Sequence, residues 1–386
     1  MTSSFNDYYY FENTHPDDKV LGNVFFNLDY IYYHSVPVKL IFSCIGLVFG
    51  IFHLTIVTRK EFRKNSVYVI MTGITVGDLY TMSSIIYVYY WLDFASYFSD
   101  PDCWIPSTYY SVLITRILSA LQDCFRQLST WLSLLLALVR LLIVKNPLNQ
   151  NLAFLSTRGF AIITILIIFS LSLIISFSNF ILYKLVDDGK YEIRFCEYLP
   201  KNYSVPYNWQ VASSDFADDH RNTVIPAFLF SDGLLKMIPA IILPVLSYLL
   251  IKCMKEAAKS RKSLGKNHKD SEISKSIKMV TLMTVCLMIA EGPIGIVHAI
   301  VTFYYDYAFI ADTRDRLDQI LMDLIVLNAI VSCIICLSVN SQYRDVARKT
   351  FCGRCRKKNN EIGIARSRGI SVSSVPRVTA SNAAIA

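Results

Sequence analysis

The sequence predicts an all-α membrane protein, a seven-transmembrane helix bundle followed by a short amphipathic eighth helix. Two observations predict this fold: seven long apolar segments run through the 386 residues, and the loops between them alternate between basic and acidic. A stretch of roughly 20 apolar residues crosses the hydrocarbon core as a helix, because a helix pairs its backbone polar groups internally. Charged residues make up only 18% of the chain, which is below the level typical of soluble proteins.

Each of the seven segments is long enough to span a membrane. The fourth is the plainest apolar run, whereas the second, third and seventh contain ionisable residues. The predicted spans are Val36–Val57, Ser66–Trp91, Tyr109–Val144, Phe160–Tyr183, Ile225–Ile251, Ile277–Tyr304 and Leu317–Val339.

The loop charges predict the orientation. Lys and Arg gather in residues 58–65, in residues 255–278 and after the last span, all on one side, and the positive-inside rule makes that side cytoplasmic. The net charge of +8 therefore indicates membrane topology and lipid contact rather than nucleic-acid binding. We predict a plasma-membrane protein organised as an extracellular N-terminus (1–35), a seven-helix bundle (36–341), an amphipathic helix (342–356) and a disordered cytoplasmic tail (357–386).

Two of the ten cysteines, Cys103 and Cys196, fall in the predicted extracellular loops. Because that side of the membrane is oxidising, we expect them to form one disulfide that ties the long second extracellular loop to the start of the third helix. Two unpaired thiols are the alternative. Asn202, in the triplet Asn-Tyr-Ser, is a glycosylation acceptor on the same side.

Charged side chains inside the spans each cost roughly 2.5–3.5 kcal/mol by insertion scales, so each one needs a reason. Asp78, midway along the second span, is a candidate for a sodium or water site, with a structural hydrogen bond as the alternative. Asp123 and Arg126 lie three residues apart, so they share a helix face and can pair. The charged residues that we single out in the spans are Asp78, Asp123, Arg126, Arg140, Lys236, Glu291 and Asp323.

The acidic, Tyr-rich outer surface suggests a cationic ligand. Asp123, Glu291 and Asp323 are the candidate groups that receive its charge, with Arg126 as a further polar contact. A purely internal ion pair of Asp123 and Arg126 is the alternative.

Two features, the prolines of the fifth and sixth spans and the amphipathic helix after the seventh, suggest a conformational change and contact with lipid at the inner face. Pro239 and Pro293 interrupt the fifth and sixth spans and should kink them, because proline removes a backbone donor. Tyr343 begins the apolar face of the short amphipathic helix. Cys352 and Cys355 end that helix, where S-palmitoylation occurs, although ordinary reduced thiols are the alternative.

Several segments together resemble a rhodopsin-type G-protein-coupled receptor, and more narrowly the nematode serpentine receptor class W, a chemoreceptor family akin to FMRFamide-type neuropeptide receptors. The segments, in chain order, are WLSLLLALVRLLIVKNPL, KMIPAIILPVLSYLLIK, IKMVTLMT, IAEGPIGI and LNAIVSCIICLSVNSQYRDVARKTF. The resemblance covers about Val36–Phe351.

The resemblance implies roles for individual residues. Asp78 matches the sodium-site aspartate of the second helix, and Arg140 matches the arginine that contacts the G protein in active receptors. Pro239 and Pro293 match the kink prolines of helices five and six, and Tyr343 matches the aromatic residue that opens the eighth helix.

The chain departs from the family pattern at four points. Val139 replaces the acidic residue that usually precedes Arg140, and Thr115 replaces the usual disulfide cysteine of the third helix. Glu291-Gly292-Pro293 lacks the tryptophan of the sixth-helix motif, and Ser332–Cys336 replaces the seventh-helix Asn-Pro motif.

We therefore expect a receptor that binds an extracellular neuropeptide or small chemosensory molecule and activates a heterotrimeric G protein. The resemblance implies no cofactor or metal, and membrane lipid is an expected partner. A seven-span channel or transporter is the alternative, because intramembrane charges also mark ion paths. An intramembrane enzyme is disfavoured, since Val76-Gly77-Asp78 lacks the first glycine of the aspartyl-protease motif.

Overall fold

The polypeptide forms a helical membrane bundle, and the computed structural model describes it over most of its length. Within the described residues, six helices are long and apolar enough to cross a membrane, and Val285–Val297 is a shorter apolar helix. These correspond to the seven predicted spans, the sixth of them in part, and confirm the predicted fold class. The described residues are 19–88, 108–145, 150–189, 191–192, 204–263, 282–283, 285–297, 300, 308–339 and 341–351.

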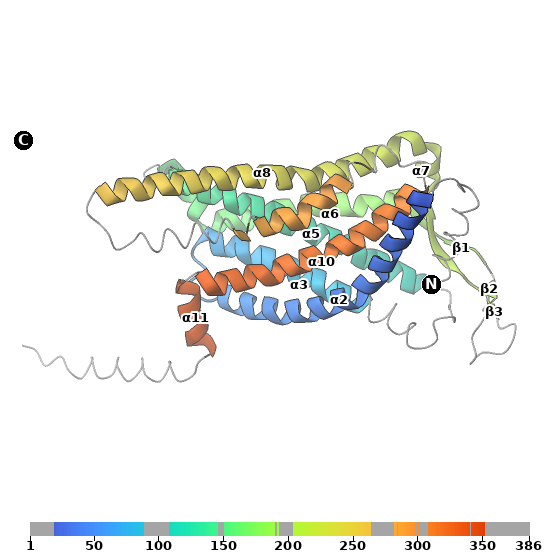
Figure 1. Ribbon diagram of the computed structural model, residues 1–386, viewed down its shortest axis with the longest axis horizontal. Helices are drawn as coiled ribbons and strands as arrows, with labels where there is room; N and C mark the ends of the chain where they lie inside the picture. The colour runs from blue at the N-terminus through green and yellow to red at the C-terminus, as the bar shows by residue number, and fades with distance from the viewer. Residues whose placement is uncertain are drawn as a thin grey trace, which may run out of the picture. The chain divides into compact units, whose positions relative to one another are not determined.

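The long helices lie alongside one another in Figure 1. They are α2 (Lys19–Val57), α3 (Ser66–Val88), α5 (Tyr109–Lys145), α6 (Arg158–Leu182), α8 (Arg221–Ser263) and α10 (Ala308–Val339). The ends of α5 and α6 fall within two residues of the prediction. By contrast, α2 begins 17 residues before the predicted Val36, because hydropathy detects the apolar part of a helix and not its polar extension.

The helix α8 continues through three prolines, Pro226, Pro239 and Pro244. Pro239 is fully buried. Pro293 lies inside the shorter helix Val285–Val297. The chain stays helical at these prolines, as membrane helices tolerate. The predicted kinks at Pro239 and Pro293 remain a prediction.

A small β structure, which the sequence analysis did not predict, follows α6. Strand β1 (Tyr183–Asp187) pairs antiparallel with β4 (Trp209–Ser213), and β2 (Tyr191–Glu192) pairs with β3 (Ser204–Val205). A short helix, α7 (Asp215–Asp219), leads from β4 into α8, and the Ser214 side chain caps it by accepting a hydrogen bond from the Ala217 amide. The described connection between α5 and α6 includes a 3-10 helix, η2 (Gln150–Ser156).

Apolar packing joins the helices of the bundle. Helix α3 packs on α2 and α5, α5 packs on α6 and α8, and α10 packs on α2. One core cluster joins α3 and α10 through Ile85, Met322 and Val326. Large apolar side chains such as Ile163 and Ile174 stay exposed along α6. In a soluble protein such a continuous apolar surface would be a liability, so we assign it to lipid.

Two glycines allow helices to approach closely beside the polar sites. A Cβ atom at Gly77 would lie 2.9 Å from the backbone oxygen of Phe125, so this glycine sets the distance between α3 and α5. A Cβ atom at Gly295 would lie 3.0 Å from the Met237 backbone. The helix Val285–Val297 therefore packs directly against the backbone of α8.

The chain divides into two compact units, Met1–Asn340 and Ser341–Ala386. The second unit contains α11 (Ser341–Phe351), close to the predicted 342–356. Its buried residues, Tyr343, Val346 and Ala347, lie at helical spacing on one face, as expected for an amphipathic helix.

Candidate functional site

Six charged side chains from four helices gather in the half of the bundle nearer the β1–β4 hairpin. We call them the charge cluster. Its members are Asp123 and Arg126 on α5, Asp232 and Lys236 on α8, Glu291 on Val285–Val297, and Asp318 on α10.

Arg126 is at the centre of the charge cluster. One terminal nitrogen lies 3.3 Å from Asp123 Oδ1, one turn earlier on α5, and the other lies 3.9 Å from Asp318 Oδ1 on α10. The guanidinium is buried, and none of its three nitrogens has a partner with hydrogen-bonding geometry in the described part of the chain. Arg126 is thus held by charge attraction and retains unused donors.

Glu291 connects the cluster to the shorter helix. Its Oε1 accepts a hydrogen bond of 3.0 Å from the Thr130 hydroxyl on α5, and both residues are buried. Glu291 also interacts electrostatically with Arg126 and Lys236. A cavity of about 10 Å³ lies between these groups. That volume is enough for one water molecule, and the site is polar enough to hold it.

Lys236 forms the second ion pair of the cluster. Its Nζ lies 2.6 Å from Asp232 Oδ2, one turn earlier on α8, and both side chains are largely buried. Both residues also interact electrostatically with Asp123. The Lys236–Asp232 pair on α8 therefore interacts with the same carboxylate, Asp123, as Arg126 on α5.

Negative charge exceeds positive charge in the cluster. Four carboxylates face two basic groups, so the net charge is −2 when all six are ionised. The accessible members are acidic: the Asp123 side chain is 42% exposed and that of Asp318 is 25% exposed, against 2% for Arg126. The arrangement can accept a further cationic group from the accessible side.

A separate polar contact joins α2 to α10. Lys39 is fully buried, and its Nζ donates a hydrogen bond of 3.0 Å to Gln319 Oε1. Lys39 also interacts electrostatically with Asp323, which the sequence analysis grouped with Asp123 and Glu291. The structure thus places Asp323 beside Lys39, and it brings Asp318 next to Arg126.

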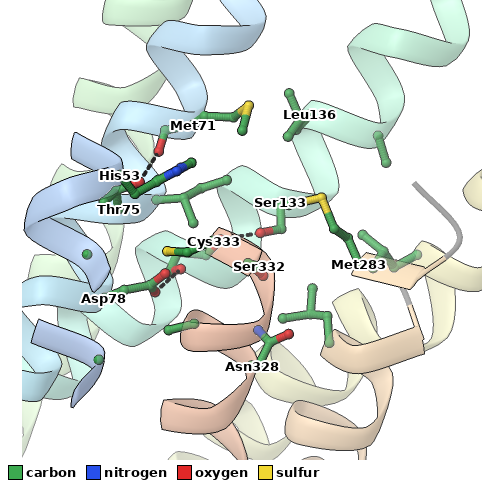
Figure 2. Close-up of a pocket in the computed structure, with 18 of the residues that line it drawn as sticks. His53, Met71, Thr75, Asp78, Ser133, Leu136, Met283, Asn328, Ser332 and Cys333 are labelled. Atoms are coloured by element: carbon green, nitrogen blue, oxygen red, sulfur yellow. Dashed lines mark hydrogen bonds between the residues drawn. The ribbon is translucent and has the colours of Figure 1, made fainter. Parts of the chain in front are cut away.

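A second polar region, which we call the polar cavity, has a volume of about 100 Å³. Figure 2 shows that its labelled side chains come from several helices. Asp78 on α3 accepts a hydrogen bond of 2.8 Å from the Ser129 hydroxyl on α5. Asn328 on α10 also lines the cavity, and its buried Oδ1 lacks a hydrogen-bond partner in the described part of the chain. The cavity has room for several water molecules.

The remaining lining of the polar cavity is mixed. Ser133 on α5 and Ser332 on α10 add hydroxyl groups, and methionine and leucine side chains form most of the apolar wall. Arg140, which is partly buried, also lines it. The predicted sodium or water residue and the predicted G-protein residue therefore border one cavity.

Sequence reasoning missed part of the charge cluster and of the contact between α2 and α10. Asp232 and Asp318 were not selected as site residues, and Lys39 was overlooked among the charged residues of the spans. Each of them is an ionisable residue in or beside an apolar helix, which is the signal that could have found them. Several predicted residues lie outside the described residues, namely Cys103, Cys196, Asn202, Cys352 and Cys355.

Comparisons with known proteins agree with the helical membrane bundle. The family model described as "Serpentine type 7TM GPCR chemoreceptor Srw" matches residues 37–354. The chain is also 25% identical over 256 residues to the G-protein coupled receptor dmsr-1 of Caenorhabditis elegans. That alignment covers 65% of this chain and 49% of the relative, so the chain spans about half the length of the protein that it matches.

Proposed function

The chain belongs to the serpentine type 7TM GPCR chemoreceptor Srw family, and on that basis we propose that it is a cell-surface receptor, not an enzyme. An extracellular ligand, either a neuropeptide or a small chemosensory molecule, binds in the half of the bundle that contains the charge cluster. Binding shifts the bundle toward a state that a heterotrimeric G protein recognises on the opposite side. The protein is a multi-pass membrane protein, with its N-terminus outside the cell and its C-terminus inside.

The charge cluster carries the proposal. Its excess of carboxyl groups over basic groups and its accessible carboxylates, Asp123 and Asp318, favour a ligand with a cationic group. A ligand cation between these carboxylates would compete with Arg126 for them. Asp318 lies on α10, and Arg126 also interacts with Glu291 on the helix Val285–Val297. Displacing Arg126 from its carboxylates would therefore affect these two helices as well as α5.

Arg140 is the proposed contact for the G protein. It lies one turn from the end of α5 opposite the hairpin, in a segment that resembles the family's activation motif. Val139 precedes it, so no adjacent carboxylate neutralises it from that position. Arg140→Ala should therefore abolish coupling while leaving surface expression and ligand binding intact, and unchanged coupling would remove Arg140 from this role.

The polar cavity is a proposed site for water or a sodium ion. Its side-chain oxygen atoms include those of the Asp78 carboxylate, the Ser129 and Ser133 hydroxyls and the Asn328 amide. Hard cations prefer oxygen ligands, and the unpartnered Asn328 Oδ1 offers one. The Asp78 carboxylate supplies the charge that such an ion needs.

A ligand screen tests the receptor proposal directly. Cells that express the full chain and a promiscuous G protein would be exposed to peptides and small odorants. We expect a response to a cationic compound that requires the G protein. A ligand current that persists without G proteins would instead support a channel. An epitope at the N-terminus, stained on intact cells, checks the orientation.

Two substitutions on α10 then test the cationic site. Asp318→Asn should weaken the response to the cationic compound by about 10- to 100-fold, because one charged contact is lost. Asp323→Asn is the matched control, since Asp323 interacts with Lys39, and we expect a change below about threefold. If Asp123→Asn, Glu291→Gln and Asp318→Asn together leave the response unchanged, the ligand binds elsewhere.

A further inference from the structure

The β1–β4 hairpin has an attachment to the bundle that neither the sequence pattern nor the comparisons predict. Strand β1 follows α6 directly, and all five of its residues pair with β4 in the register from Tyr183 opposite Ser213 to Asp187 opposite Trp209. At its base, the Ser214 amide and hydroxyl donate to the backbone oxygens of Leu182 and Ile181, at 2.8 and 2.7 Å. The hairpin and the end of α6 thus form one continuous structure.

Arg116 on α5 binds this structure at the junction of α6 and β1. A terminal nitrogen donates a hydrogen bond of 2.8 Å to the backbone oxygen of Tyr183. The guanidinium carbon lies 4.6 Å from the ring centroid of Phe180 and 5.8 Å from that of Tyr183. One cation therefore contacts the last turn of α6 and the first residue of β1.

The geometry of this contact requires arginine. The planar guanidinium can lie over an aromatic ring and donate a hydrogen bond at the same time, because its donors lie in its own plane. A lysine ammonium at the same position could still donate to a carbonyl, but it has no plane to stack. The contact should therefore weaken with Lys and disappear with Ala.

A second contact joins the other strand to the same helix. The ring of Trp209, the first residue of β4, lies edge-on to Tyr109 at a centroid distance of 4.9 Å. Tyr109 begins α5 and precedes Arg116 by two turns. The hairpin is thus attached to α5 at two heights, once through each strand.

We propose that Arg116 is a positioning residue that attaches the β1–β4 hairpin to α5 and so sets its place above the charge cluster. Asp123 follows Arg116 by seven residues, which is two helical turns and about 10 Å along the same side of α5. A shift of the hairpin at Arg116 therefore changes the approach to Asp123. The attachment through Arg116 is non-covalent, and it acts in addition to the disulfide expected between Cys103 and Cys196.

Hydrogen exchange of the purified full chain in nanodiscs tests this role without a ligand or a G protein. In Arg116→Ala, the amides of Tyr183–Asp187 and Trp209–Ser213 should exchange about tenfold faster or more, because a charged hydrogen bond and a ring contact are lost. Exchange in α3 and α10 should not change. Arg116→Lys should give an intermediate increase, which a general loss of stability would not produce.

The control is Arg158→Ala, which removes an exposed arginine at the other end of α6. It should leave hairpin exchange unchanged. If Arg116→Ala does not fold, Phe180→Leu removes one ring from the contact and should give a smaller increase confined to the hairpin. Hairpin exchange equal to wild type in Arg116→Ala, or an increase spread evenly over the helices, would overturn the proposal.

Discussion

The charge cluster and the polar cavity both place carboxylates inside a membrane bundle, but they stabilise them in opposite ways. The charge cluster surrounds its carboxylates with Arg126 and Lys236 and leaves about 10 Å³ free. The polar cavity gives Asp78 a hydroxyl partner and leaves about 100 Å³ free. One site neutralises charge with the protein's own groups, and the other leaves room for water or an ion.

The difference predicts how each site responds to the loss of one group. A buried ion pair adds little net stability, but removing one partner is costly because the other charge is left buried and uncompensated. Asp78 is hydrogen-bonded to the Ser129 hydroxyl, so no substitution of its partner leaves a second charge buried and uncompensated. Substitutions should therefore be severe in the charge cluster and mild at Asp78.

The largest effect is expected for Arg126→Met. This change keeps most of the side-chain volume but leaves Asp123, Glu291 and Asp318 without their shared cation, so we expect a loss of about 3–5 kcal/mol. Thermal unfolding of the purified protein in nanodiscs measures it. Adding Asp318→Asn to Arg126→Met should restore part of the loss, because one uncompensated carboxylate is removed.

Arg158→Met is the control for Arg126→Met, since it removes an exposed arginine outside both sites. Its midpoint should stay close to that of wild type. If Arg126→Met is as stable as Arg158→Met, the carboxylates of the charge cluster do not depend on Arg126.

An intermediate effect is expected for Gly77→Ala, which tests the frame of the polar cavity. The added Cβ would lie 2.9 Å from the Phe125 backbone oxygen, so α3 and α5 must separate. We expect a loss of about 1–3 kcal/mol, as for other overpacked sites. The separation should also lengthen the hydrogen bond between Asp78 and Ser129, which joins the same two helices.

Gly292→Ala is the matched control, because a Cβ atom at Gly292 meets nothing within 4 Å. Alanine also favours the helix by up to about 1 kcal/mol. We expect the thermal midpoint of Gly292→Ala to equal or exceed that of wild type. Equal losses in the two variants would mean that helix flexibility, and not the close approach at Gly77, determines stability.

The sequence predicts the helices well because each span carries its own signal. Apolar length alone locates α5 and α6 to within two residues of their observed ends. The β1–β4 hairpin carries no such local signal, since its strands pair across a segment of more than 20 residues. Its attachment through Arg116 depends on that pairing and could not be predicted.

For the site residues too, a contact within one helix could be predicted from the sequence, whereas contacts between helices could not. The Asp123–Arg126 contact follows from their spacing on one helix, and the structure contains it. Partners on different helices depend on how each helix is rotated and where it crosses its neighbours. For that reason the sequence pattern favoured Asp323 on α10, whereas Asp318, about one turn earlier, contacts Arg126.

The smallest effect is expected at Asp78, where a change of salt distinguishes a polar cavity that binds sodium from one that holds only water. If the cavity binds sodium, wild type should be more stable in sodium chloride than in choline chloride of equal concentration, by about 1.4 kcal/mol at ten times the dissociation constant. Asp78→Asn keeps an oxygen to accept from Ser129 but removes the charge that holds the ion. This variant should therefore show the same thermal midpoint in both salts and should be no less stable than wild type in choline chloride, because no unpaired charge remains buried. A sodium effect that persists in Asp78→Asn would place the ion elsewhere, and equal midpoints for wild type in the two salts would leave the cavity to water.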